Sequence, residues 1–284
     1  MRYCFIRFPE GKLKAVTLSY DDGVKADLKL VKLLDKYGMK CTFNLNCHFG
    51  NPNKMTVDEI KENILAKGHE IAVHGERHMA PGVAQPHLII RDIQRCRERL
   101  EEEFGIFVRG MAYPDSGITK MHGGNSYSVI REYVKDLGIV YSRTLGADHN
   151  RFLIPEDFIA WMPNAHHKNP KLMEYVDSFV SVEEEKLFSS RRHAMLFYLW
   201  GHSYEFNNDD NWDLMESFCE KISGKADTWY ATNMEIYEYV TAFNSLVFSA
   251  NGEKIYNPTL KKIWLDVDTK PCVIEPGETL EFGK

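Results

Sequence analysis

The sequence predicts an α/β protein built as a parallel barrel. Short apolar runs alternate with amphipathic helical patterns over most of the 284 residues, which is typical of repeated βα units around a parallel sheet. The chain is also long enough to supply one complete barrel of this kind. We expect strands at residues 14–20, 40–46, 70–75, 109–114, 138–144, 159–165, 194–202 and 228–233.

The segments between these runs carry helix signals. Residues 25–38 place five apolar side chains on one stripe and end at Gly38, a residue suited to the left-handed position after a helix. Residues 56–68 begin with Thr56 and Glu59, the spacing of a capping box. Further helices are expected at residues 87–105 and 234–246.

The pattern changes near the C-terminal end. Residues 261–282 alternate strand-like runs with the turn signals "TKP" and "EPGE", which indicates a short β extension. Because no linker rich in Ser, Gly or Pro separates the two parts, we expect a barrel over residues 1–245 and an extension packed on it over residues 246–284.

Composition excludes several classes of protein. With 44% hydrophobic and 27% charged residues and a net charge of −6, the chain lacks the basic surface that a nucleic-acid partner would require. No window of 18 apolar residues predicts a membrane span, and the six cysteines form no CxxC pair. The first residues show no export signal, so we expect a cytoplasmic protein, or an extracytoplasmic one if a signal has been removed.

Functional side chains follow four of the predicted strands. Asp21 and Asp22 follow the strand at 14–20, and His74 lies at the end of the strand at 70–75. Asp115 follows the strand at 109–114, and His202 ends the strand at 194–202. In a parallel barrel the catalytic residues lie at the carboxyl ends of the strands. These side chains are therefore expected to meet at one end of the barrel.

The stretch "HGERH" spaces His74 and His78 as i and i+4, which would bring two imidazoles together on one helical turn. Two histidines and one carboxylate, here Asp22, are a common catalytic zinc set. A bound dication would also offset the repulsion between Asp21 and Asp22. Alone, "HGERH" would be read as two solvated histidines and "DDG" as an acidic turn.

Taken together, these motifs resemble the polysaccharide deacetylase family, which is carbohydrate esterase family 4 with the NodB-homology domain. "LSYDDG" at 18–23 is similar to the family's TFDDG motif, and "HGERH" is similar to its H[ST]xxH motif. Weaker similarities are "SRT" at 142–144 and "YLWGH" at 198–202. The resemblance spans residues 16–232 and implies a distorted (β/α) barrel of about seven strands.

The resemblance also implies a reaction and a role for each residue. The family removes acetyl groups from N-acetylated carbohydrates with water activated by a divalent metal, most often Zn²⁺, with Co²⁺, Ni²⁺ or Fe²⁺ as alternatives. Asp21 would be the general base and His202 the general acid, while the metal ligands would be Asp22, His74 and His78. The partner is then an N-acetylated sugar or oligosaccharide.

Two positions depart from the family pattern. Ala112 stands where the third motif carries an arginine, and Arg143 on the next predicted strand is placed to replace it and to orient Asp21. A structural ion pair is the alternative role for Arg143. Gly75 replaces the serine or threonine that follows the first histidine of the second motif, so a supporting hydrogen bond must come from elsewhere.

Aromatic and loop residues near these strand ends are candidates for substrate contact. Aromatic faces stack on the apolar side of sugar rings. A buried position in the core is the alternative for Tyr113 and for Trp200, and a solvated loop is the alternative for His166. The candidates are Tyr113, Pro114, Asp115, Trp161, His166 and Trp200.

Two other functions compete with deacetylation of a sugar. One is hydrolysis of a C–N bond in a small molecule that is not a sugar, as related barrels perform. The other is a non-catalytic carbohydrate-binding protein, which the missing arginine at Ala112 would suggest. The oligomeric state follows from none of these patterns.

Overall fold

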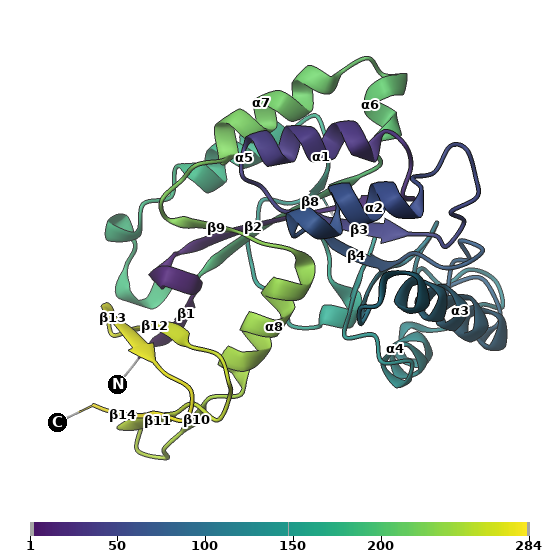
Figure 1. Cartoon of the computed structure of the whole chain (residues 1–284). Coiled ribbons are helices and arrows are strands. Elements are labelled where there is room, and N and C mark those ends of the chain that lie inside the picture. The colour runs from purple at the N-terminus through teal and green to yellow at the C-terminus, as the bar shows by residue number, and fades with distance from the viewer. Residues whose placement is uncertain (1–2, 147, 283–284) are drawn as a thin grey trace.

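The structure is a computed structural model that describes residues 3–146 and 148–282 (Figure 1). Its centre is a sheet of parallel strands in the order β6-β5-β4-β3-β2-β8-β7, and β9 pairs with the beginning of β2. The strands are β2 (Lys14–Asp21), β3 (Thr42–Leu45), β4 (Glu70–Val73), β5 (Gly110–Ala112), β6 (Tyr141–Arg143), β7 (Ala165–His166), β8 (Met195–Gly201) and β9 (Thr228–Tyr230).

The sheet curls into a distorted half-barrel of the NodB type, which confirms the predicted fold class. The segment before β7 bridges the two ends of the sheet, since the N–H of Trp161 donates to the carbonyl of Ser142 on β6 and the N–H of Asn164 donates to Tyr198 on β8. The strand predicted at 159–165 is mostly wrong. Asp157 accepts the N–H of Ile159 and opens a 3₁₀ turn, and Pro163 has no N–H for a ladder.

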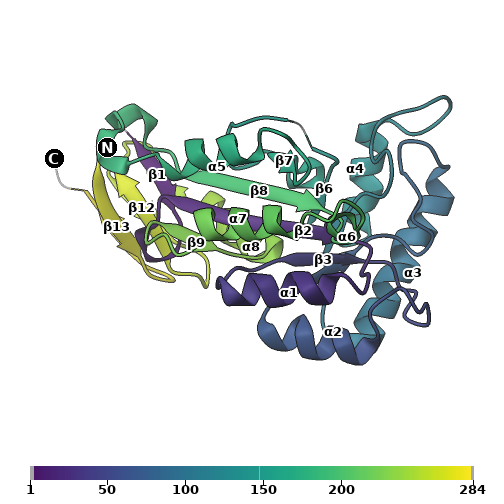
Figure 2. The ribbon, with the colours of Figure 1, turned by 90° about the horizontal axis from the view of Figure 1, so that it is seen from above.

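Helices cover the outside of the curled sheet (Figure 2). The capping box predicted at Thr56 is present, and Thr232 forms a second one that begins α8. The helices are α1 (Asp27–Lys36), α2 (Val57–Asn63), α3 (Pro86–Phe104), α4 (Tyr127–Asp136), α5 (Leu172–Val180), α6 (Tyr204–Asn208), α7 (Trp212–Ile222) and α8 (Asn233–Asn244). The 3₁₀ turns are η1 (Pro9–Gly11), η2 (Leu65–Lys67), η3 (Phe158–Ala160), η4 (Glu184–Lys186) and η5 (Ser189–Arg191).

The β extension combines a strand from early in the chain with the strands that follow α8. Strand β1 (Cys4–Arg7) pairs with β12 (Ile263–Val267), which pairs with β13 (Lys270–Ile274). A second small sheet joins β10 (Val247–Phe248), β11 (Lys254–Tyr256) and β14 (Thr279–Glu281). The β character of residues 261–282 is confirmed, whereas the division of the chain at residue 245 stays a prediction.

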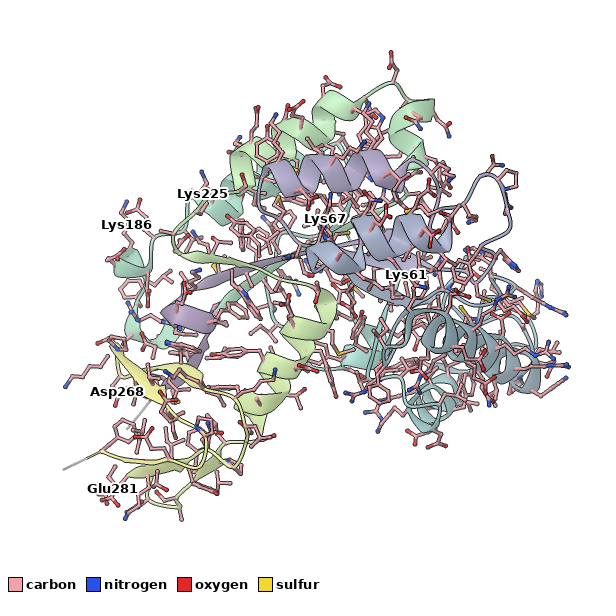
Figure 3. The ribbon with its side chains drawn as sticks, in the orientation of Figure 1. Lys61, Lys67, Lys186, Lys225, Asp268 and Glu281 are labelled. Carbon is pink, nitrogen blue, oxygen red and sulfur yellow. The ribbon has the colours of Figure 1, made fainter. Side chains whose placement is uncertain are left out.

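Charged side chains surround this fold. Lys61, Lys186 and Glu281, which are labelled in Figure 3, are exposed. No helix in the described part of the chain has the length and apolar character to cross a membrane.

Candidate active site

The carboxyl ends of four strands bring the predicted chemical groups together. Asp21 ends β2, Arg143 ends β6, and His74 and His202 directly follow β4 and β8. All four belong to the same parallel sheet, and Figure 2 shows β2 and β8 running in the same direction with their ends at the same side. The site is therefore built on rigid strands, which fix the directions of its side chains.

Asp21 lies at the centre of the site and is buried. Its Oδ2 contacts Nη2 of Arg143, and its Oδ1 accepts a 2.8 Å hydrogen bond from Nδ2 of Asn44. The same Oδ2 lies 3.8 Å from Nε2 of His74 and 3.9 Å from Nε2 of His202. Burial raises the pKa of Asp21, but the charges of Arg143 and the two histidines outweigh it and hold that pKa below its ordinary value. Asp21 is therefore a carboxylate at neutral pH.

The three predicted metal ligands also meet. One donor atom from each of Asp22, His74 and His78 lies within 4.8 Å of the other two. Nδ1 of His74 hydrogen-bonds to the carbonyl of Ala112 at 3.0 Å, so Nδ1 carries the hydrogen and Nε2 offers its lone pair. In the described part of the chain that Nε2 is buried without a hydrogen-bond partner. A bound cation would supply the partner, and two imidazoles with one carboxylate suit zinc.

A loop, and not the predicted helical turn, brings the two histidines together. Gly75 and His78 both have left-handed φ values, 74° and 56°, and the rings of His74 and His78 are 4.8 Å apart at their centroids. A Cβ at Gly75 would collide with Oδ2 of Asp92, whose Oδ1 accepts the N–H of Arg77 at 2.6 Å. Asp92 thus occupies the space that a serine or threonine would fill.

Lys54 is a neighbour of Asp22 that the sequence reasoning missed. Asp22 has a left-handed φ of 80°, held by its N–H, which donates to the carbonyl of Asn44 at 2.9 Å. Nζ of Lys54 donates to the carbonyl of Asp22 at 2.6 Å and lies 3.7 Å from its Oδ1. A cation in this position offsets the repulsion between the two adjacent aspartates.

Arg143 lies where the predicted replacement requires it. Its guanidinium is fully buried, contacts Asp21 and stacks 4.0 Å above the ring of Trp200. In the pairing of β5 with β6, Ala112 is the direct partner of Arg143. The positive charge has therefore moved by one strand relative to the family motif, while the small alanine leaves room beside it.

Two of the predicted substrate contacts are core residues. Trp161 is 1% exposed and packs against Tyr141, Phe158 and Tyr198. The hydroxyl of Tyr113 is turned inward and donates to the carbonyl of Ile159 at 2.9 Å. The prediction that Trp161 and Tyr113 contact substrate is therefore corrected, because neither side chain has a free face.

The other predicted contacts differ in their exposure. Pro114 is buried, and Asp115 is exposed with a left-handed φ of 49°. Trp200 is 8% exposed and covers Arg143, so it supports the site more than it lines an open groove. His166 is partly exposed beside His202.

His202 has a carboxylate on each side of its ring. Nε2 faces Asp21, and Nδ1 lies 3.4 Å from Oε2 of Glu205, in the first turn of α6. Burial alone would lower the pKa of His202, but Glu205, Asp21 and Asp22 raise it above its ordinary value. Sequence reasoning missed Glu205, although its spacing of three residues from His202 was the available signal.

Sequence comparison relates part of the chain to a known family. Residues 9–141, just under half of the chain, match the model of the family described as polysaccharide deacetylase. Over these residues the chain is similar to that family. The matched segment contains β2 to β5 and with them Asp21, Asp22, His74 and His78. No curated protein sequence matches the chain significantly.

Solved structures share the fold of this chain. A probable polysaccharide deacetylase from Pseudomonas aeruginosa PAO1 is 14% identical, with a TM-score of 0.59 over 81% of this chain and 92% of its own. The Puue allantoinase is 12% identical, with a TM-score of 0.57 over 81% and 91%. The Xyl-CE4 domain of a xylanase from the hindgut metagenome of Trinervitermes trinervoides is 14% identical, with a TM-score of 0.51 over 81% and 92%.

Proposed function

We propose that the chain is a metal-dependent hydrolase that removes the acetyl group from an N-acetylated carbohydrate. The observation that carries the proposal is one cluster of side chains. The ligand set of Asp22, His74 and His78 lies directly beside the buried carboxylate of Asp21. A base, an acid and a cation site within one strand-end cluster are what amide hydrolysis requires.

The metal would be held by Asp22, His74 and His78, with zinc as the first expectation and cobalt, nickel or ferrous iron as alternatives. When bound, such an ion supplies Lewis-acid chemistry and makes water more acidic. The carbonyl of Ala112 orients His74 for this task through its contact with Nδ1.

Asp21 is the proposed general base. It accepts the proton of the attacking water at Oδ2, the oxygen that faces the two histidines. Arg143 contacts Oδ2 of the carboxylate and Asn44 donates to Oδ1, so the orientation of Asp21 is fixed before substrate binds. Arg143 also keeps Asp21 ionised, which is the state that a base must have.

His202 is the proposed general acid. A raised pKa leaves its ring protonated over a wider pH range, and Nε2 is the nitrogen on the side of Asp21. Nε2 would give its proton to the nitrogen of the amide, because this nitrogen must be protonated before the C–N bond breaks and the amine departs. Glu205 stabilises the charged ring from the Nδ1 side.

Acetate release tests the proposal. Purified protein loaded with Zn²⁺ is incubated with chitooligosaccharides, with acetylated peptidoglycan fragments and with allantoin as an amide that is not a sugar. Acetate from either sugar, lost after chelation and in His78→Ala, supports the proposal. Turnover of allantoin alone selects C–N hydrolysis of a small molecule, and sugar binding without acetate selects a non-catalytic binding protein.

A further inference from the structure

Beside the proposed metal site lies a second cluster of metal-binding side chains. It gathers around one oxygen, Oε2 of Glu205. Nε2 of His166 lies 3.1 Å from this oxygen, Nε2 of His167 lies 3.3 Å from it, and Nδ1 of His202 lies 3.4 Å from it. Three imidazole nitrogens therefore converge on one carboxylate oxygen.

The separations from Oε2 of Glu205 agree with those between the ligands of a tetrahedral ion. Metal–ligand bonds of about 2.0–2.2 Å place the ligand atoms of a tetrahedron about 3.3–3.6 Å apart. Donor atoms of His166, His202 and Glu205 also lie within 4.8 Å of one another. Since these three side chains are only partly buried, small rotations can bring them to the closer spacing.

His167 gives independent evidence for a ligand. Its side chain is 1% exposed and is stacked on Phe206 with ring centroids 4.1 Å apart. Neither ring nitrogen has a hydrogen-bond partner within the described ranges, although Nε2 lies 3.3 Å from Oε2 of Glu205. A side chain at Gly201 would collide with this ring, so the chain keeps that space free for His167. A buried imidazole without a partner costs free energy that a bound ion would recover.

Hydrogen bonds among these side chains do not satisfy all of the buried nitrogens of the cluster. Nε2 of His167 lies 3.3 Å from Oε2 of Glu205 but makes no hydrogen bond to this carboxylate. Nδ1 of His202 is also buried without a hydrogen-bond partner among the residues described. The nearby Lys168 is engaged elsewhere, since it pairs with Asp209 at 2.7 Å and lies 3.9 Å from the other oxygen of Glu205.

We propose a second metal site, for zinc or a similar transition-metal ion, whose ligands are His166, His167, His202 and Glu205. A set of three imidazoles and one carboxylate selects such ions over Mg²⁺ and Ca²⁺, which prefer oxygen ligands. An ion on Nδ1 would take the place of the proton that the charged ring of the proposed acid carries there, and it would leave one hydrogen on His202, at Nε2, the nitrogen that faces Asp21. Occupation of this site therefore replaces the doubly protonated ring of His202. Asp21 would then lie between two cation sites.

Zinc stoichiometry tests this site without measuring activity. Metal-free protein, prepared by dialysis against a chelator, is titrated with Zn²⁺ by calorimetry, and bound zinc is measured after gel filtration. We expect about two equivalents for the wild type and about one for Glu205→Gln, for His167→Phe and for His78→Ala. His193→Ala, which removes an exposed histidine outside both clusters, should keep two. The remaining equivalent in each single variant shows that the variant is folded.

The two metal sites can fail separately. A wild type that binds one zinc, lost in His78→Ala and kept in Glu205→Gln, contradicts the second site and leaves the proposed function intact. One zinc that is kept in His78→Ala and lost in Glu205→Gln supports the second site and removes the metal site of the proposed function.

Discussion

Arg143 contacts the carboxylate of Asp21 from a position directly opposite Ala112 in the pairing of β5 with β6. Both partners are almost completely buried: 0% of the side-chain surface of Arg143 and 2% of that of Asp21 is exposed. A buried carboxylate that loses its cation pays the full cost of desolvation. The relationship therefore predicts effects on stability as well as on chemistry.

Arg143→Met should lower the free energy of unfolding by about 3–5 kcal/mol, because it leaves Asp21 charged and unpaired in the core. Adding Asp21→Asn should recover most of this loss, as expected for two residues that interact directly. Urea unfolding of the single and double variants measures both effects. Arg131→Met removes a partly exposed pair with Asp157 and should cost much less than Arg143→Met, because solvent screens this pair. Equal losses at both arginines would contradict the buried ion pair.

Metal binding should stabilise the folded protein through the ligands of the first site. At a zinc concentration one hundred times the Kd, the free energy of unfolding rises by about 2.7 kcal/mol for each site. His78→Ala should lose the share of this gain that comes from the first site, since His78 is exposed and its removal leaves the fold intact. Thermal unfolding with and without Zn²⁺ provides the comparison. The same zinc-induced shift in Tm in both proteins would show that His78 is no ligand.

Gly75→Ala should be more costly than an ordinary change at a left-handed glycine. Gly38 has a similar φ of 63°, with open space where a Cβ would be, so Gly38→Ala should cost about 1 kcal/mol from the backbone alone. Gly75→Ala adds the collision with Asp92 and displaces the loop that carries His78. We expect a larger loss of stability and weaker zinc binding. Equal stability of the two variants in urea would exclude the collision.

Asp27 should make stability depend on pH. It is fully buried and accepts a 2.6 Å hydrogen bond from Ser203, and burial raises its pKa to about 8. In the unfolded chain an aspartate loses its proton near pH 4. Between these values the folded protein holds the additional proton, so the stability contributed by Asp27 is full below pH 4 and is lost as the pH rises to 8.

The comparison is with Asp27→Asn, which imitates the protonated side chain at every pH. Between pH 5 and pH 8, metal-free wild type should lose stability relative to this variant, by up to about 1.4 kcal/mol per pH unit. Urea unfolding at several pH values gives the difference. A constant difference across this range would mean that Asp27 is ionised in the folded protein.

The sequence predicted best what depends on local patterns. Seven of the eight expected strands formed, as did the capping box at Thr56, because apolar runs and caps act over a few residues. The strand at 159–165 failed where Pro163 and the Asp157 turn override the apolar pattern. β1 was missed because its partner, β12, begins more than 250 residues later.

The site was predictable to the extent that strand ends converge. Asp21, Asp22, His74, His78 and His202 did meet, and their roles stay predictions. Trp161 and Tyr113 could not be placed, since strands buried on both faces show no alternation that separates core from groove. The meeting of His167 with Glu205 was not predictable, because it depends on the contact of α6 with the residue after β7, where His167 stacks on Phe206.

Asp21→Asn is the most direct test of the central claim, that Asp21 is the base beside a metal held by its neighbours. Acetate release and bound zinc are measured on the same samples of wild type and variant. The account predicts that kcat falls by about 10²- to 10⁴-fold while bound zinc is unchanged. Acetate release at the wild-type rate by zinc-loaded Asp21→Asn would contradict it.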